Sequence, residues 1–176
     1  MFQKKKYTRP LKDMVRESIF NLLTHSNKIS FHIEKSNILD LYSGSGSFGL
    51  ECISRQANYV CFIEKEKEVL KILTNNIKKL KVEKKTKIFF NDVFELIEKQ
   101  NISLSKFDLI FCDPPFEDSN VSKLIKLILN KELLKKNGII ILHRKKNIEE
   151  RLPDCLNILD IRIYGLSKII FGKLLT

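Results

Sequence analysis

The sequence predicts one α/β domain: a mostly parallel sheet of seven strands, helices on both faces, and an antiparallel strand pair at the C-terminal end. Short apolar segments alternate with amphipathic segments at helical spacing, and a glycine-rich loop follows the first apolar segment. Parallel strands read as continuous apolar runs because helices cover both of their faces. A chain of 176 residues suits a single domain with a real core.

The N-terminal part is expected to be a basic arm, residues 1–9, followed by a helix. The helix is predicted from Pro10 to about Thr24, because proline suits a first helical turn. Its apolar side chains share one face: Leu11, Val15, Ile19, Leu22 and Leu23. Residues 25–36 are polar and irregular. Residues 10–176 are therefore expected to form the single domain, with the helix over 10–24 and the core over 37–176.

The core alternates strands with helices. The predicted strands are Asn37–Tyr42, Tyr59–Glu64, Thr86–Phe90, Phe107–Cys112, Gly138–His143, Leu156–Tyr164 and Lys168–Leu174, the last two joined by a turn at Gly165-Leu166. The predicted helices run from the glycine loop to about Arg55, over Lys65–Leu80, over Val93–Lys99, from about Asn120 to Leu134, and near Ile148–Arg151. Two helices have predicted buried faces: Val69, Ile72, Leu73, Ile77 and Leu80 in one, and Val121, Leu124, Ile125 and Ile128 in the other.

Composition narrows the class of protein. The net charge of +11 favours a polyanionic partner, although abundant lysine also follows from an AT-rich genome. No apolar run is long enough to span a bilayer, and the N-terminus lacks the apolar region of a secretory signal. Four scattered cysteines without a C-x-x-C spacing predict neither a metal site nor a disulfide framework. We expect a cytoplasmic monomer with no membrane partner.

The glycine loop, LDLYSGSGSFG, contains Gly44, Gly46 and Gly49 in a G-x-G-x-x-G pattern that suits either NAD or S-adenosylmethionine (SAM). Glu64, at the end of the second strand, can bind a ribose in both cases. Asp40 favours SAM over NAD, because a carboxylate at this position suits the cationic sulfonium and ammonium groups of SAM better than the pyrophosphate of NAD. The alternative is that Asp40 ties the loop through side-chain to backbone hydrogen bonds.

Asn91-Asp92 ends the third strand and offers a second cofactor contact. Asp92 can accept a hydrogen bond from the adenine amino group, with the Val93 backbone beside it. Asp92 can equally act as the N-cap of the helix that starts near Val93, and the two roles are compatible.

Asp113-Pro114-Pro115-Phe116, at the end of the fourth strand, predicts methyl transfer to an exocyclic amine. The prolines stop the strand and bring no N–H groups, so a carbonyl can be held outward. If the Asp113 carboxylate and the Pro114 carbonyl each accept one N–H of the amine, its lone pair turns toward the methyl donor. Phe116 is expected to stack on the base. The alternative is a Pro-Pro turn that ends a strand, with Asp113 as a cap.

Three segments together resemble bacterial 16S ribosomal RNA guanine-N2 methyltransferases, which are class I SAM-dependent enzymes with a Rossmann-like fold. These segments are RPLKDMVRESIFNLL, LDLYSGSGSFGLECISR and FDLIFCDPPF, and they occur in the family's order. The chain departs from the family at Leu11-Lys12, where the family has Thr-Thr, and in its short start, FQKKKY.

The resemblance implies the site residues and partners. SAM would be bound by Asp40, Gly44, Ser45, Gly46, Glu64, Asp92 and Val93. Asp113, Pro114, Pro115 and Phe116 would hold the guanine N2, and the acceptor would be 16S ribosomal RNA or the 30S particle. The clustered positive charge of the N-terminal segment, and not the resemblance, predicts RNA contacts for the basic residues Lys4, Lys5, Lys6, Arg9 and Arg16, and no metal is expected. Arg9, Asp13, Arg16 and Glu17 match the N-terminal signature.

Other functions stay open at this point. The acceptor could be adenine N6 or a protein glutamine, or the chain could be a non-catalytic RNA-binding assembly protein of the same fold. His25, His32 and His143 are expected to be solvated or structural, because no cysteine or carboxylate spacing makes them ligands or a triad.

Overall fold

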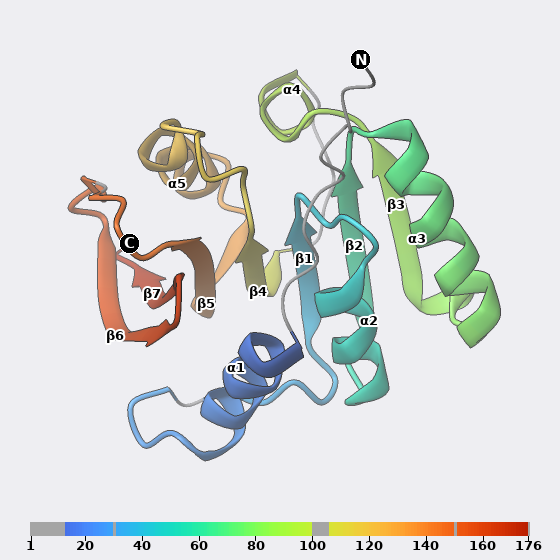
Figure 1. The fold of residues 1–176 in the computed structure, drawn as a ribbon, viewed down its shortest axis with the longest axis horizontal. Coiled ribbons are helices and arrows are strands. Elements are labelled where there is room, and N and C mark those ends of the chain that lie inside the picture. Colours follow the sequence, from blue (N-terminus) through green and yellow to red (C-terminus); the bar gives the residue numbers. More distant parts are fainter. Residues whose placement is uncertain (1–12, 30, 100–105, 150, 176) are drawn as a thin grey trace.

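One seven-stranded sheet forms the centre of the structure, a computed structural model that describes residues 13–29, 31–99, 106–149 and 151–175 (Figure 1). The strands are β1 Asn37–Leu41, β2 Tyr59–Glu64, β3 Thr86–Phe90, β4 Phe107–Cys112, β5 Leu134–Lys145, β6 Leu156–Tyr164 and β7 Ser167–Leu174. Their order across the sheet is β3-β2-β1-β4-β5-β7-β6. Strands β1 to β5 are parallel, and β7 is antiparallel to both β5 and β6. The predicted fold class is confirmed.

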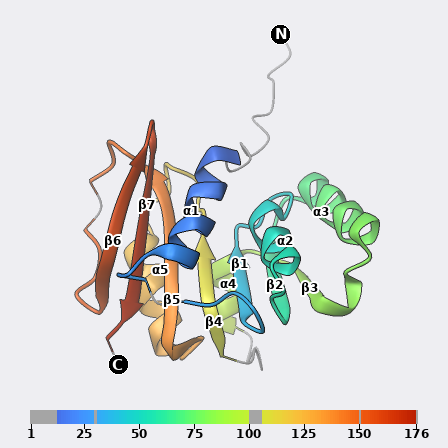
Figure 2. The same ribbon diagram turned by 90° about the horizontal axis from the view of Figure 1, so that it is seen from below.

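Helices cover both faces of the sheet (Figures 1 and 2). They are α1 Asp13–His25, α2 Ser47–Ser54, α3 Lys67–Leu80, α4 Val93–Lys99 and α5 Val121–Asn130, with a 3-10 turn at Glu83–Lys85. Successive strand residues point to opposite faces, so Ile38 packs with α1, α2 and α3, whereas Leu39 packs with α4 and α5. Because two cores sandwich the sheet, its central strands are apolar throughout, as the sequence predicted.

The strand order reverses between β1 and β4, the two neighbours at the centre of the sheet. In open α/β sheets, ligands bind beyond the carboxyl ends of the strands at such a switch point. The carboxyl ends of β1 to β5 lie at one edge, because these strands are parallel and contiguous. The segments Asp40–Gly46, Glu64, Asn91-Asp92 and Asp113–Phe116 therefore meet at this edge.

Helix α3 shows where the predicted buried faces were too wide. Val69, Leu73 and Ile77 are buried, but Ile72 and Leu80 are 50% and 57% exposed. The buried residues follow a spacing of four, which makes one narrow stripe. The predicted face of α5 is confirmed, since Val121, Leu124, Ile125 and Ile128 are all buried.

Two predictions near β5 were also wrong: the end of one helix and the presence of another. Helix α5 ends at Asn130, four residues before the predicted end, because Leu134 pairs with Phe107 of β4 and starts β5. No helix forms over the described residues 146–149; residues 146–147 are a turn, in which the Lys146 N–H donates to the Leu166 carbonyl. The predicted turn at Gly165-Leu166 is confirmed, and Gly165 has a φ of 58°.

Within the described residues, no helix is both long and apolar enough to cross a membrane.

Candidate active site

The loop after β1 is built from left-handed backbone. Gly44 has a φ of 56° and Gly46 a φ of 81°, conformations that glycine adopts without cost. Tyr42 also has a positive φ, 60°, which is uncommon for a residue with a side chain. The strand therefore ends at Leu41, one residue earlier than predicted. This turn is part of the candidate site because it begins the glycine loop at the carboxyl end of β1.

Gly49 lies where helix α2 meets the sheet. A Cβ at this position would sit 2.4 Å from Phe62 Cε1 and 2.8 Å from Val60 Cγ1, and both side chains are fully buried. No ordinary side chain fits at this distance, so the third glycine of the motif permits close packing of helix on strand.

Asp40 is buried beneath the glycine loop, and its Oδ2 accepts a hydrogen bond from the Gly49 N–H at 3.0 Å. This is the loop-tying contact that the sequence left open as the alternative. Burial raises the pKa of Asp40 well above its ordinary value, and the nearby charges of Asp113 and Glu64 raise that pKa further. A cation placed at this edge would favour the ionised carboxylate, so the site suits a positively charged ligand.

Glu64, at the end of β2, organises the backbone around it. Its carboxylate accepts hydrogen bonds from the N–H groups of Gly44, Lys65 and Glu66, each at 2.8 Å. The Gly44 bond spans 20 residues and ties the glycine loop to β2. Glu64 therefore shapes the loop from the next strand.

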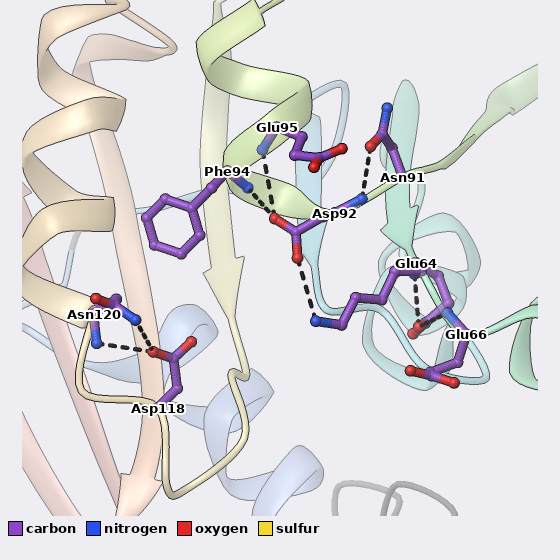
Figure 3. A network of polar contacts seen from close by, with 9 residues as sticks. Glu64, Glu66, Asn91, Asp92, Phe94, Glu95, Asp118 and Asn120 are labelled. Atoms are coloured by element: carbon purple, nitrogen blue, oxygen red, sulfur yellow. Dashed lines mark hydrogen bonds and ion pairs between the residues drawn. The ribbon is translucent and has the colours of Figure 1, made fainter.

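Asp92 caps helix α4 (Figure 3). Its Oδ1 accepts from the N–H groups of Phe94, at 2.9 Å, and Glu95, at 3.4 Å, while its Oδ2 pairs with Lys65 Nζ at 3.2 Å. The N-cap role that the sequence allowed is confirmed. The Lys65 pair joins the ends of β2 and β3, because Lys65 directly follows Glu64. Val93 is buried, and the Ser45 carbonyl accepts a hydrogen bond from Asn76 Nδ2.

Asp113 leaves β4 beside the end of β1, where its N–H donates to the Leu41 carbonyl at 3.4 Å. The two prolines end the strand as predicted. In the part of the chain that the structure describes, the carbonyl groups of the loop after β4 form no hydrogen bonds with a neighbouring strand. Arg144 of β5 donates hydrogen bonds to them instead.

Arg144 is the largest fully buried side chain of the described residues. Its guanidinium donates to the carbonyls of Pro115 and Asp118, at 2.9 and 2.8 Å, and to that of Phe116 at 3.2 Å. The contact with the Pro114 carbonyl is longer, 3.5 Å. Arg144 thus holds the loop by three shorter hydrogen bonds and leaves the Pro114 carbonyl the least engaged of the four.

His143 contacts Asp113, which the sequence interpretation did not anticipate. Its Nδ1 lies 2.8 Å from Asp113 Oδ1, and its Nε2 lies 2.9 Å from Ser167 Oγ. The expectation of a solvated or structural histidine is therefore incomplete, since His143 is buried against a candidate catalytic residue. Its place at the end of the fifth strand was the available signal, but it pointed to Asp113 only once β4 and β5 were known to be neighbours.

The basic residues expected to contact RNA are only partly within the described residues. Lys4, Lys5, Lys6 and Arg9 lie outside them. Arg16, in α1, forms an ion pair with Asp13 at 2.7 Å and is partly exposed.

Together, this fold, a glycine loop after β1, acids at the ends of β1 and β2, and Asp-Pro-Pro-Phe after β4 define a class I SAM-dependent methyltransferase. The chain belongs to the family described as Conserved hypothetical protein 95, whose sequence model matches residues 1–173. It shares this family with proteins named ribosomal RNA small subunit methyltransferase D. The resemblance stated from the sequence is confirmed.

Two of the relatives that carry that name illustrate the similarity. The protein from Buchnera aphidicola is 36% identical over 138 residues, which cover 78% of this chain and 68% of the relative. The protein from Haemophilus influenzae is 32% identical over 158 residues, 90% of this chain and 79% of the relative.

Solved structures show the same fold. The protein HI0767 from Haemophilus influenzae superposes with a TM-score of 0.77 at 30% identity, covering 93% of this chain and 98% of its own. An RNA methyltransferase from Salinibacter ruber, in complex with S-adenosylhomocysteine, superposes with a TM-score of 0.67 at 16% identity and covers 94% of both chains.

Proposed function

We propose that this enzyme transfers a methyl group from SAM to the exocyclic N2 of a guanine in 16S ribosomal RNA. One observation carries the proposal: hydrogen bonds from His143 and Arg144 hold the Asp113-Pro114-Pro115-Phe116 loop at the switch point of a class I methyltransferase sheet. The relatives' names support the choice of small-subunit ribosomal RNA. The net charge of +11 suits an RNA partner.

The cofactor end of the site fits SAM. Three carboxylates, those of Asp40, Glu64 and Asp113, lie close enough for two of them to raise the pKa of the third. A sulfonium and an ammonium group offset that repulsion, whereas a pyrophosphate would add to it. Asp40 would face the cationic part, Glu64 the ribose, and Asp92 with Val93 the adenine, while Gly44, Ser45 and Gly46 would line the methionine part. When bound, SAM supplies a methyl group that is already activated as an electrophile.

The acceptor end fits an amine with two N–H groups. Guanine N2 is a poor nucleophile because its lone pair is delocalised into the ring. The Asp113 carboxylate and the Pro114 carbonyl would each accept one N–H, so that the lone pair is turned out of the ring plane. The reaction forms the N–CH3 bond, breaks the S–CH3 bond, and releases one proton from the amine to Asp113 or to solvent. Phe116 would stack on the splayed guanine.

The proposal is tested by offering labelled SAM together with 30S particles, naked 16S ribosomal RNA or DNA. The nucleic acids are then digested to nucleosides and the proteins of the particles to peptides. N2-methylguanosine from ribosomal RNA is expected. N6-methyladenine, a methylated protein glutamine, or SAM binding without transfer to any acceptor would overturn it.

Asp113→Ala is expected to lower turnover by at least about 100-fold. The substitution removes both the hydrogen-bond acceptor for the guanine N–H and a negative charge near the reacting nitrogen. The dissociation constant of SAM should change little. Asp154→Ala, an exposed aspartate outside the site, is the matched control. Substantial turnover by the Asp113 variant would refute the role given to this carboxylate.

A further inference from the structure

Three side chains from three strands form a continuous polar row at the acceptor end of the site. Asp113 follows β4, His143 lies in β5, and Ser167 begins β7. The strand register brings them together. Cys112 pairs with Leu142, so Asp113 and His143 are the next residues along, and Lys145 pairs with Ser167 across the antiparallel β5–β7 ladder.

The row determines which imidazole nitrogen carries the proton. An ionised Asp113 can only accept, so the 2.8 Å contact requires a proton on His143 Nδ1. In the neutral ring Nε2 is then an acceptor, and the Ser167 hydroxyl, 2.9 Å away, is its donor. The opposite tautomer would direct two lone pairs at each other across the Asp113 contact.

His143 also contacts the other acceptor-binding group. The Phe116 ring meets the imidazole edge to face, with 5.5 Å between ring centroids and 81° between planes. One buried ring therefore touches both the carboxylate and the aromatic side chain proposed to hold the guanine. Because Oδ1 of Asp113 is engaged by His143, its other oxygen is the one left to accept from the amine.

We propose that His143 is a positioning residue: its Nδ1–H fixes the rotamer of Asp113 for methyl transfer, and Ser167 fixes the ring. The inference rests on the proposed function, since it assigns Asp113 to the acceptor amine. His143 itself is not proposed to touch the substrate.

Amide variants separate the position of the donor from the presence of a polar group. The Asn side chain can place an N–H near the position of Nδ1, whereas the longer Gln side chain reaches the position of Nε2. We expect His143→Ala and His143→Gln to lower kcat by about 10- to 100-fold, the loss of one hydrogen bond to a charged group. His143→Asn should keep kcat within about 5-fold, and Ser167→Ala should cost less than His143→Ala. His32→Ala, an exposed histidine, is the matched control.

The outcomes distinguish this inference from the proposed function. Failure of the wild-type enzyme to form N2-methylguanosine in ribosomal RNA would refute the proposed function, whereas turnover by Asp113→Ala would refute the role given to Asp113. Loss of turnover in Asp113→Ala, with His143→Ala, His143→Gln and His143→Asn all like wild type, would refute the positioning role alone. Equal losses in His143→Asn and His143→Gln, accompanied by equal falls in melting temperature, would also refute it, because a merely structural histidine does not distinguish the two amides.

A spectroscopic test needs no RNA substrate. The chain has three histidines, so the imidazole nitrogens of ¹⁵N-labelled protein give few signals. The expected signature of His143 is a protonated Nδ1 and an unprotonated Nε2, and this preference should be lost in Asp113→Ala. An Nε2–H tautomer in the wild type, or an unchanged signal in Asp113→Ala, would overturn the inference.

Discussion

Gly49→Ala tests whether the third glycine of the loop serves packing. The added methyl would lie 2.4 Å from Phe62 Cε1 and 2.8 Å from Phe62 Cζ. Ordinary carbon contacts are about 3.5–4.0 Å, so helix α2 or the Phe62 ring must move by roughly 1 Å. Phe62 is fully buried and belongs to strand β2, so its ring has little room to move, and helix α2 cannot shift without disturbing its packing on the sheet.

Overpacking of this kind costs typically about 1–3 kcal/mol. For a domain of this size each kcal/mol lowers the melting temperature by about 2–4 °C, so a fall of roughly 2–12 °C is expected by thermal unfolding. SAM affinity should also fall, because the Gly49 N–H that binds Asp40 moves with the helix.

Gly165→Ala is the matched control, because its Cβ would meet nothing within 4 Å and only its φ of 58° is strained. It should cost about 1 kcal/mol and leave SAM binding unchanged. A Gly49→Ala protein that melts within about 1 °C of wild type would refute the packing argument.

Two further substitutions test the carboxylate and the guanidinium of the site. The pKa of Asp40 is raised in the folded state, so the folded protein keeps the carboxyl proton of Asp40 to higher pH than the unfolded chain does. The contribution of Asp40 to the free energy of unfolding therefore falls as the pH rises above about 4. The melting temperature of Asp40→Asn should therefore rise relative to that of wild type between about pH 4.5 and neutral pH, and a difference in melting temperature that does not change with pH would contradict the burial argument. In calorimetry, Asp40→Asn should also bind SAM about tenfold or more weakly. Arg144→Lys should destabilise the protein by about 2–3 kcal/mol in denaturant unfolding and lower kcat, because an ammonium group cannot donate to the carbonyls of Pro115, Phe116 and Asp118 together. Wild-type stability of this variant would show that these hydrogen bonds of Arg144 do not hold the loop.

Much of the fold could be predicted from the sequence. Strands β2, β3, β4 and β6 and helix α4 have the predicted bounds, because each is a short apolar or amphipathic segment between clear breaks. The errors fall where neighbouring elements decide. The local sequence predicts that Leu134 ends a helix, but its pairing with Phe107 makes it the start of β5. The local sequence also predicts that Ile72 is buried, but only a narrow stripe of α3 contacts the sheet and Ile72 lies outside it.

The candidate site divides in the same way. Asp40, Glu64, Asp92 and Asp113 could be found because each lies at or next to the carboxyl end of a predicted strand. Their partners could not be found. The Gly49 N–H, the Gly44 N–H and Lys65 come to these carboxylates only through loop and strand geometry.

The sequence by itself determined the parallel α/β architecture, the glycine loop, the Asp-Pro-Pro-Phe segment and the family, because these depend on local spacing and residue type. Only the tertiary structure decided that β5 follows β4 and that β7 inserts between β5 and β6. That order places His143 and Arg144 on the Asp-Pro-Pro-Phe loop, and Ser167 behind His143. Strand order depends on pairing between segments far apart in the chain, so no local pattern of residues contains it.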